Sequence, residues 1–284
     1  MCATCGCSAT HDGHDHGDGH AHDHGPEHAH DDGPEHAHDG GPEHAHGHER
    51  TDHARSASRL IQLEHDVLAR NDALAARNRR WLADRGVLAL NLVSSPGAGK
   101  TTLLERTIRD LGAALPIAVI EGDQATARDA ARIRAAGARA VQINTGTVCH
   151  LDAAMIARAL EELDPARGTV VMIENVGNLV CPALFDLGEH AKVVVASATE
   201  GDDKPLKYPH MFRASHTMLL NKIDLAPYVA FDVERCVGYA RDVNPRLEII
   251  RTSATRGDGM ADWYAWLHAR RAAVDVVRRT GAIA

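Results

Sequence analysis

The sequence predicts an α/β fold, in which a mostly parallel sheet carries helices on both faces and follows a disordered, histidine-rich tail. Two observations predict the sheet. From about residue 85 onward short apolar runs alternate with helical patterns, and near residue 94 a strand leads through a glycine-rich loop into a helix. Such alternation is typical of parallel sheets, because a helix usually connects neighbouring parallel strands. A third observation, the composition of the first 50 residues, predicts the tail.

The first 50 residues differ in composition from the rest of the 284-residue chain. They hold 11 acidic residues, one Arg and 13 of the 20 His, a net charge of −10, and Gly-Pro-Glu-His-Ala-His recurs every eight residues. So few apolar side chains cannot offset the entropy of ordering, and we expect residues 8–53 to be disordered. The other 234 residues carry 30 basic and 28 acidic side chains, and this near-neutral balance argues against a nucleic-acid partner.

The chain shows neither a run of about 18 apolar residues nor a basic-then-apolar signal sequence. We therefore expect a cytoplasmic protein with no membrane partner. Disulfides are rare in that reducing compartment, so the six cysteines favour metal-binding or catalytic roles over a disulfide framework, with Cys236, on a helical pattern, expected in the core.

A helical extension is expected at residues 54–84, followed by one domain at 85–284. The extension shows apolar residues seven apart, which fits one buried helix face; these are Leu60, Val67, Leu74 and Trp81, with Ile61, Leu68 and Leu82 beside them. In the domain, strands are expected at 87–93, 117–120, 140–143, 170–173, 193–196, 217–220 and 247–250. Helices are expected at about 101–112, 125–136, 151–163, 229–242 and 260–279.

Residues 94–102 match the phosphate-binding motif G-x-x-x-x-G-K-[ST], except that Ser94 stands at the first glycine. The glycines allow backbone N–H groups to turn toward phosphate oxygens, and the helix N-terminus adds partial positive charge. Lys100 would reach the β- and γ-phosphates, and Thr101 would bind Mg²⁺. The predicted nucleotide-binding residues here are Pro96, Gly97, Ala98, Gly99, Lys100, Thr101 and Thr102.

A second motif, Asn221-Lys222-Ile223-Asp224, follows a later strand and favours GTP over ATP. The carboxylate of Asp224 would accept hydrogen bonds from guanine N1–H and the exocyclic amine, two donors that adenine does not present together. Ser253 and Ala254, after the next strand, fit a loop that backs the base.

Two acidic residues at strand ends are candidates for Mg²⁺ binding and catalysis. Asp123 could meet the metal or orient the attacking water. Glu174 could hold the metal through water, while the N–H of Gly177 could sense the γ-phosphate. For both acids the alternative is a helix cap at a strand end. With Lys100, these two carboxylates form the predicted catalytic set.

Cysteine and histidine residues form two further candidate metal sites. Cys2, Cys5 and Cys7 are three thiols within six residues, a soft-ligand set that suits Ni²⁺ and also Zn²⁺ or Cu(I). Cys149, His150 and Cys181 could bind metal, shared between two subunits if two copies meet there, or could be an ordinary packed set, since free Cys is often buried. The tail's imidazoles favour storage of several metal ions.

Taken together, these motifs resemble the HypB family, the nickel-incorporation GTPases of [NiFe]-hydrogenase maturation. The resemblance covers residues 85–284 and the first seven residues. It rests on Cys2-x-x-Cys5-x-Cys7 and on residues 95–102, 121–124, 174–182, 199–209 and 221–224. The resemblance implies a phosphate-loop NTPase fold of the SIMIBI type and a GTPase that dimerises with nucleotide at the interface.

The resemblance also implies a function: a GTP-hydrolysing metallochaperone that stores nickel and delivers it to the hydrogenase large-subunit precursor. It implies a high-affinity nickel site at Cys2, Cys5 and Cys7, and a weaker nickel or zinc site at Cys149, His150 and Cys181. The implied partners are a second copy of the chain, the companion nickel chaperone HypA and the large-subunit precursor. Lys204 is expected to approach the partner copy's nucleotide.

Two alternatives remain open at this stage. A urease-type nickel GTPase would share the phosphate loop and the Asn-Lys-x-Asp motif, although the cysteine-rich end and the stretch at 174–182 favour the hydrogenase branch. A nickel or zinc storage buffer would use the nucleotide domain only for regulation.

Overall fold

The computed structural model describes residues 48–123 and 128–280. The chain divides into two compact units, residues 1–63 and 64–284. Of the first unit the structure describes only the start of α1 (His48–Arg85), a helix that continues into the second unit. The helix begins six residues before the predicted position. The predicted nickel site at Cys2, Cys5 and Cys7, and the histidine-rich tail up to residue 47, lie outside the described residues.

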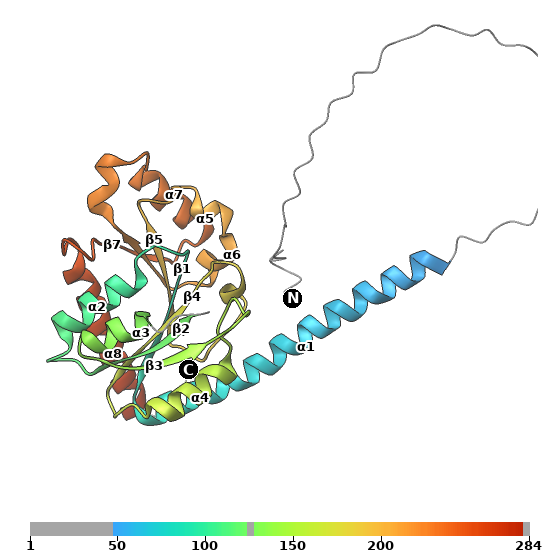
Figure 1. Ribbon diagram of the computed structural model, residues 1–284, viewed down its shortest axis with the longest axis horizontal. Helices are drawn as coiled ribbons and strands as arrows, with labels where there is room; N and C mark the ends of the chain where they lie inside the picture. The colour runs from blue at the N-terminus through green and yellow to red at the C-terminus, as the bar shows by residue number, and fades with distance from the viewer. Residues whose placement is uncertain (1–47, 124–127, 281–284) are drawn as a thin grey trace, which may run out of the picture. The chain divides into compact units, whose positions relative to one another are not determined.

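The second unit is built around a parallel sheet (Figure 1). Its seven strands have the order β3-β2-β4-β1-β5-β6-β7. All adjacent pairs are parallel, so the predicted α/β fold is confirmed. The strands are β1 (Leu88–Ser94), β2 (Ile117–Asp123), β3 (Arg139–Asn144), β4 (Val170–Gly177), β5 (Ala191–Ser197), β6 (Thr217–Asn221) and β7 (Glu248–Arg251). Each lies where an apolar run predicts it.

Five helices of the second unit lie close to their predicted positions. They are α2 (Lys100–Leu111), α3 (Arg128–Ala135), α4 (Ala153–Leu163), α7 (Val233–Val243) and α8 (Met260–Thr280). Four short elements were not predicted, because they are too short for a helical repeat to show: η1 (Cys181–Ala183), α5 (Lys204–Lys207), α6 (Pro209–Ala214) and η2 (Ile223–Tyr228). Among the described residues no helix is both long and apolar enough to cross a membrane.

Helix caps shift two predicted boundaries. Asp232 accepts a hydrogen bond from the N–H of Arg235, so α7 begins at Val233 rather than near residue 229. Asp152 accepts one from the N–H of Met155, so α4 begins at Ala153. Cys149 and His150 lie in the loop before α4.

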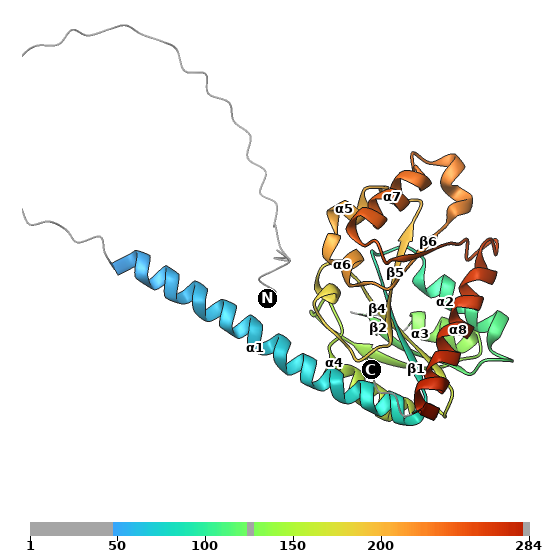
Figure 2. The same cartoon turned by 180° about the vertical axis from the view of Figure 1, so that it is seen from behind.

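Both faces of the sheet are covered by helices, as Figures 1 and 2 show. Side chains alternate between the faces along each strand. Leu90 and Leu92 of β1 pack into a core that includes residues of α2, α3 and α8, whereas Ala89 packs with residues of α1 and α4. The remaining core, over β5 and β6, includes Phe212 of α6 and Cys236 of α7. This two-sided cover explains the apolar runs within the strands.

Within the second unit, two asparagines attach α1 to the domain. The side chain of Asn78 donates to the carbonyls of Ala153 and Leu187 at 2.8 and 3.0 Å. Asn71 accepts from the N–H of Ala153 at 2.9 Å. The predicted apolar stripe is wrong in its earlier part, because Val67 is 51% exposed and the buried face starts at Asn71. The helix is held by hydrogen bonds as well as by apolar contact.

Candidate functional site

The phosphate loop has the backbone geometry that its glycines predict. Gly97 and Gly99 adopt φ angles of +76° and +99°, in the left-handed region that favours glycine. A Cβ on Gly99 would also lie 2.6 Å from Nδ2 of Asn221, so a larger residue does not fit there. The loop connects β1 to α2 and lies at the carboxyl end of the sheet, where ligands bind in open α/β folds.

Ser94, which stands where the phosphate-binding motif has its first glycine, contacts the motif lysine directly. Nζ of Lys100 donates a 2.6 Å hydrogen bond to Oγ of Ser94. Lys100 is 8% exposed, and burial lowers its pKa, an effect that the nearby carboxylates of Glu174 and Glu121 oppose. The serine thus holds a desolvated cation beside the loop.

The loop after β6 is tied to the phosphate loop by two side chains. Nδ2 of Asn221 donates to the carbonyl of Ala98 at 3.0 Å, while its Oδ1 accepts from the N–H of Ala254 at 3.1 Å. Nζ of Lys222 donates to the carbonyl of Gly97 at 2.7 Å. The two predicted motifs, more than a hundred residues apart in sequence, therefore form one site.

The base-recognition candidates follow β6 and β7. Oδ1 of Asp224 is buried and has no hydrogen-bond partner among the described residues. Ser253 is fully buried, and its N–H donates to the carbonyl of Asp258 at 2.8 Å. An unpartnered carboxylate oxygen beside an ordered loop is suited to accept hydrogen bonds from a ligand.

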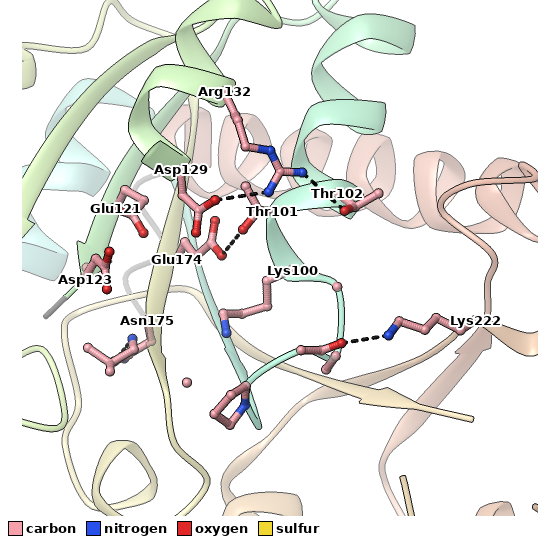
Figure 3. A pocket seen from close by; sticks show the side chains of 17 residues that line it. Lys100, Thr101, Thr102, Glu121, Asp123, Asp129, Arg132, Glu174, Asn175 and Lys222 are labelled. Atoms are coloured by element: carbon pink, nitrogen blue, oxygen red, sulfur yellow. Dashed lines mark hydrogen bonds and ion pairs between the residues drawn. The ribbon is translucent and has the colours of Figure 1, made fainter. Parts of the chain in front are cut away.

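Three carboxylates converge beside the hydroxyl of Thr101 (Figure 3). Oxygens of Glu121, Asp129 and Glu174 all lie within 4.8 Å of one another. Glu121 and Glu174 are register partners in the β2 and β4 pairing, which places their side chains on the same side of the sheet. Sequence reasoning identified Glu174 but not Glu121 or Asp129 as members of this group.

Burial makes two of these carboxyl groups titrate at a higher pH than a glutamate in water. It raises the pKa of Glu121 to about 8, with a further contribution from Glu174. Burial also raises the pKa of Glu174 to about 7, against the attraction of Lys100. One oxygen of each, Oε2, is buried without a hydrogen-bond partner among the described residues. This oxygen-rich group fits Mg²⁺, which prefers carboxylate ligands.

The phosphate loop and the carboxylate group line one cavity, whose volume is about 540 Å³. Further side chains line it as well. Arg132 of α3 donates to Asp129 at 3.0 Å and to Oγ1 of Thr102 at 3.4 Å, and it was not predicted. Of the predicted nucleotide and catalytic residues, Asn221, Asp224, Ser253 and Ala254 do not line the cavity. Those that do are Pro96, Gly97, Ala98, Gly99, Lys100, Thr101, Thr102, Asp123, Glu174, Gly177 and Lys222.

Lys204 of α5 also reaches the phosphate loop. Its Nζ donates a 2.6 Å hydrogen bond to Oγ of Ser95 and lies 3.3 Å from Oε1 of Glu200. Within one copy of the chain, this partly exposed lysine therefore contacts the phosphate loop through Ser95.

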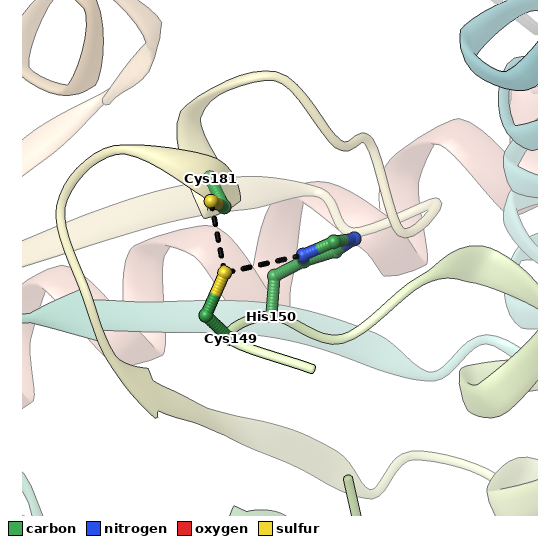
Figure 4. Close-up of side chains that lie close together, drawn as sticks. All are labelled: Cys149, His150 and Cys181. Carbon is green, nitrogen blue, oxygen red and sulfur yellow. Dashed lines mark hydrogen bonds between the residues drawn. The ribbon is translucent and has the colours of Figure 1, made fainter. Parts of the chain in front are cut away.

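A second group of ligand-type side chains consists of Cys149, His150 and Cys181, which the structure brings together (Figure 4). The Sγ atoms of Cys149 and Cys181 are 3.0 Å apart, and Sγ of Cys149 lies 4.0 Å from Nδ1 of His150. Neither cysteine forms a disulfide with another described residue. The imidazole stacks on the ring of Phe185 at 3.9 Å between centroids. Burial lowers the pKa of His150, which favours the neutral, metal-binding form.

The glycine-rich turn, the buried lysine and the carboxylate group beside Thr101 define a nucleotide-binding domain of the phosphate-loop class. Comparison with known proteins agrees: a family model described as "CobW/HypB/UreG, nucleotide-binding domain" matches residues 88–251. The chain belongs to this family, and within it to the HypB proteins.

Individual relatives are similar over most of the chain. The hydrogenase maturation factor HypB of Escherichia coli K12 is 59% identical over 230 residues, which cover 80% of this chain and 79% of that protein. The crystal structure of HypB from Archaeoglobus fulgidus has a TM-score of 0.68 and 41% identity, and the match covers 72% of this chain and 99% of that one. HypB from Helicobacter pylori in complex with nickel gives 0.67 and 37%, with coverage of 71% and 95%.

Proposed function

We propose that this protein is a GTP-hydrolysing nickel metallochaperone that delivers nickel to the hydrogenase large-subunit precursor. One observation carries the proposal. Glu174 of the carboxylate group and Cys181 of the thiol group lie on one short stretch of chain at the end of β4, so the nucleotide cavity and the soft-ligand group share a structural element. A protein with this arrangement can link phosphate chemistry to the release of a bound metal ion.

GTP is the proposed substrate because of the loops after β6 and β7. The buried, unpartnered Oδ1 of Asp224 supports a role in accepting hydrogen bonds from the guanine N1–H and exocyclic amine. Asn221 supports that role indirectly, since it ties this loop to the phosphate loop. Ser253 and Ala254 would back the base, and Lys222 would cover it.

Mg²⁺ is the proposed companion of the nucleotide. Thr101 and Glu174 would hold it, with Glu121 and Asp129 of the same group as further direct or water-mediated ligands. Asp123, which lines the cavity, would act through water. When bound, the ion would neutralise charge on the β- and γ-phosphates. Lys100 would stabilise the same charge from the other side of the loop, and Gly177 would offer its N–H to the γ-phosphate. A carboxylate of this group would orient the attacking water.

Nickel is the proposed cargo, bound by Cys149, His150 and Cys181. Two thiols and an imidazole form a soft-ligand set that suits Ni²⁺ or Zn²⁺. The nickel complex of the Helicobacter pylori relative supports this choice. Cys2, Cys5 and Cys7 are proposed as a second, tighter nickel site, and the histidine-rich tail as a store.

The proposed partners are a second copy of the chain, HypA and the large-subunit precursor. In this scheme GTP closes a homodimer, and hydrolysis changes the segment between Glu174 and Cys181 so that nickel passes to a partner. Lys204 would exchange its contact with Ser95 for one with the partner copy's nucleotide.

The test measures nickel transfer from the full chain to HypA and to the large-subunit precursor, with GDP, GTP and a non-hydrolysable GTP analogue. We expect the transfer rate to depend on the nucleotide and Lys100→Ala to abolish hydrolysis. Arg109→Ala, on the exposed side of α2, serves as the matched control. Equal nickel affinity and equal transfer rates in all three nucleotide states would refute the relay.

A function in nickel storage can be distinguished from GTP-dependent nickel delivery in cells grown at limiting nickel. If deletion of residues 8–50 leaves hydrogenase maturation intact while Lys100→Ala abolishes it, storage is accessory to delivery. If the deletion abolishes maturation and Lys100→Ala does not, the protein acts mainly as a nickel store. Urease activation in the same cells separates a hydrogenase client from a urease client.

A further inference from the structure

The segment from Glu174 to Cys181 carries two asparagines that contact the loops of the soft-ligand group. Asn175 is 2% exposed, and its Oδ1 accepts from the N–H of Leu151 at 3.3 Å. Leu151 directly follows His150. The side chain next to the catalytic carboxylate Glu174 therefore holds the backbone next to a metal-ligand candidate.

Asn178 contacts the chain beside both cysteines. Its Nδ2 donates to the carbonyl of Cys149 at 3.3 Å, and its Oδ1 accepts from the N–H of Val180, the residue before Cys181, at 2.8 Å. These two loops are about thirty residues apart in sequence, and one amide joins them. The distance between the two thiols thus depends on where Asn178 lies.

A series of buried polar side chains, linked by hydrogen bonds and an ion pair, also holds these loops. Asn91 of β1 accepts from Nδ2 of Asn175 at 3.2 Å and donates to Oε1 of Glu189 at 3.1 Å. Lys192, 5% exposed, lies 3.9 Å from that carboxylate and donates to the carbonyl of Pro182 at 2.8 Å.

Lys192 also donates to the carbonyl of Phe185 at 3.3 Å, and the ring of Phe185 stacks on His150. Each candidate metal ligand is therefore linked, through hydrogen bonds or ring stacking, to a residue in or next to β1, β4 or β5. Breaking one hydrogen bond in such a network would leave buried polar groups without partners, at a cost in free energy. The network is therefore expected to move as a unit.

The middle of the segment contacts the phosphate loop. A Cβ on Gly177 would lie 3.1 Å from Cα and N of Pro96, so the backbones are already in close contact. A change of conformation in the phosphate loop would displace Gly177 and the adjacent Asn178. Close packing transmits such a displacement because there is little empty space to absorb it.

We propose that Asn178, together with Asn175, is a positioning residue that makes the nickel affinity of Cys149, His150 and Cys181 depend on the bound nucleotide. This inference rests on the proposed function. It assigns the coupling to two amide side chains that hold the ligand loops to the end of β4. Neither amide binds nickel itself.

The test uses the full chain with Cys2, Cys5 and Cys7 changed to Ser. Absorbance from thiolate-to-nickel charge transfer then reports Cys149 and Cys181, because the tail supplies only imidazoles and carboxylates. The buried Cys236 thiol stays protonated, since burial raises its pKa to about 12. Free nickel is set by a chelator buffer, so that nickel bound to the tail does not alter it. Nickel affinity is measured with GDP and with a non-hydrolysable GTP analogue.

We expect the two affinities to differ by about fivefold or more in this parent protein, a typical size for coupling between sites. Asn178→Ala should bring their ratio to within about twofold of one. Asn178→Asp, which loses the donor to Cys149, should do the same and serves if the Ala variant folds poorly. Asn244→Ala is the matched control, because Asn244 also donates to two carbonyls, those of Phe212 and Ser215, but outside this network. It should keep the parent ratio.

Two further readouts separate coupling from misfolding. Metal-free GTP hydrolysis should be unchanged in Asn178→Ala, because Asn178 does not line the nucleotide cavity. By linkage, nickel should change the ratio of the GTP-analogue and GDP affinities by the same factor in the parent, and by less than about twofold in the variant. A parent ratio far from one that Asn178→Ala retains overturns the positioning role alone. A parent ratio of one contradicts the nickel relay as well.

Discussion

Thr101 and Glu174 are joined by a hydrogen bond in which Oγ1 of the threonine donates to Oε1 of the glutamate over 2.8 Å. The two residues come from the start of α2 and from β4, 73 positions apart in the sequence. Both are candidate Mg²⁺ ligands, so this contact holds the two halves of the proposed metal site together before nucleotide binds. Such preorganisation lowers the cost of assembling the site during the reaction.

The Glu174→Gln variant should therefore lose most of its GTP hydrolysis. The amide can still accept the hydrogen bond from Thr101 but carries no charge for Mg²⁺. We expect a fall of roughly 10²-fold, equivalent to about 3 kcal/mol, and a higher Mg²⁺ requirement. Phosphate release measured across a Mg²⁺ titration checks this. Glu161→Gln, on the exposed side of α4, is the control, and hydrolysis at the parent rate in Glu174→Gln would exclude the metal-binding role.

Asp224→Asn should change the base preference from guanine to xanthine. The amide can donate to the C2 carbonyl of xanthine, whereas it no longer offers the charged acceptor for the guanine amine. Loss of a hydrogen bond to a charged group costs about 1.5–3 kcal/mol, so GTP affinity should fall by about 10-fold or more. Binding titrations with GTP and XTP check the exchange, with exposed Asp242→Asn as control. If GTP affinity stays at the parent value, base recognition lies elsewhere.

His190 should make the folded domain less stable in mild acid. Its Nδ1 accepts from the N–H of Ala89 at 3.1 Å, and burial lowers its pKa to about 4. In the unfolded chain the pKa is near its ordinary value of about 6.5. The unfolded state therefore binds more protons between these values, and the free energy of unfolding falls as pH drops from about 6.5 to 4.

The His190→Asn variant tests this pH dependence, because Oδ1 of Asn can replace Nδ1 as the acceptor without titrating. Urea unfolding across pH 4.5 to 7 should show a smaller acid loss in the variant, by on the order of 2 kcal/mol. His268→Asn on the exposed side of α8 should keep the parent slope. An unchanged slope in His190→Asn would assign the acid sensitivity to other groups.

Asn78→Ala should destabilise the domain by about 2–3 kcal/mol. The substitution leaves the carbonyls of Ala153 and Leu187 without the donor that they have in the folded chain, and buried unpartnered carbonyls are costly. Chemical unfolding measures the loss, with exposed Arg77→Ala as a control that should change stability by less than about 0.5 kcal/mol. Equal stability of the two variants would mean that the hydrogen bonds of Asn78 contribute little to the stability of the domain.

Much of the architecture could be predicted because its signals are local. Each strand is a run of apolar residues bounded by turn residues, and both phosphate-loop glycines precede a helix that begins at Lys100. The helix caps Asp152 and Asp232 were harder to place, since a single capping residue shifts a boundary without changing the hydrophobic pattern. The buried face of α1 was misplaced because two of its anchoring residues, Asn71 and Asn78, are polar.

In the candidate site, too, some residues could be identified from local sequence signals and others could not. Motif residues such as Lys100 and Asp224 could be identified because their chemistry requires neighbours in sequence. Glu121 and Asp129 could not, since nothing near them in the chain shows that they approach Glu174. Only the parallel register of β2 and β4 places the two glutamates side by side, and burial together with neighbouring carboxylates raises their pKa values.

By itself, the sequence determined the strand and helix order, the phosphate loop and the cysteine and histidine residues available for metal. These depend on short-range periodicity and on the chemistry of single residues. Only the tertiary structure decided that Cys149 and Cys181 approach to 3.0 Å and that Asn178 joins their loops. The reason is physical: distances between segments far apart in the chain are set by strand register and close packing, which no local pattern encodes.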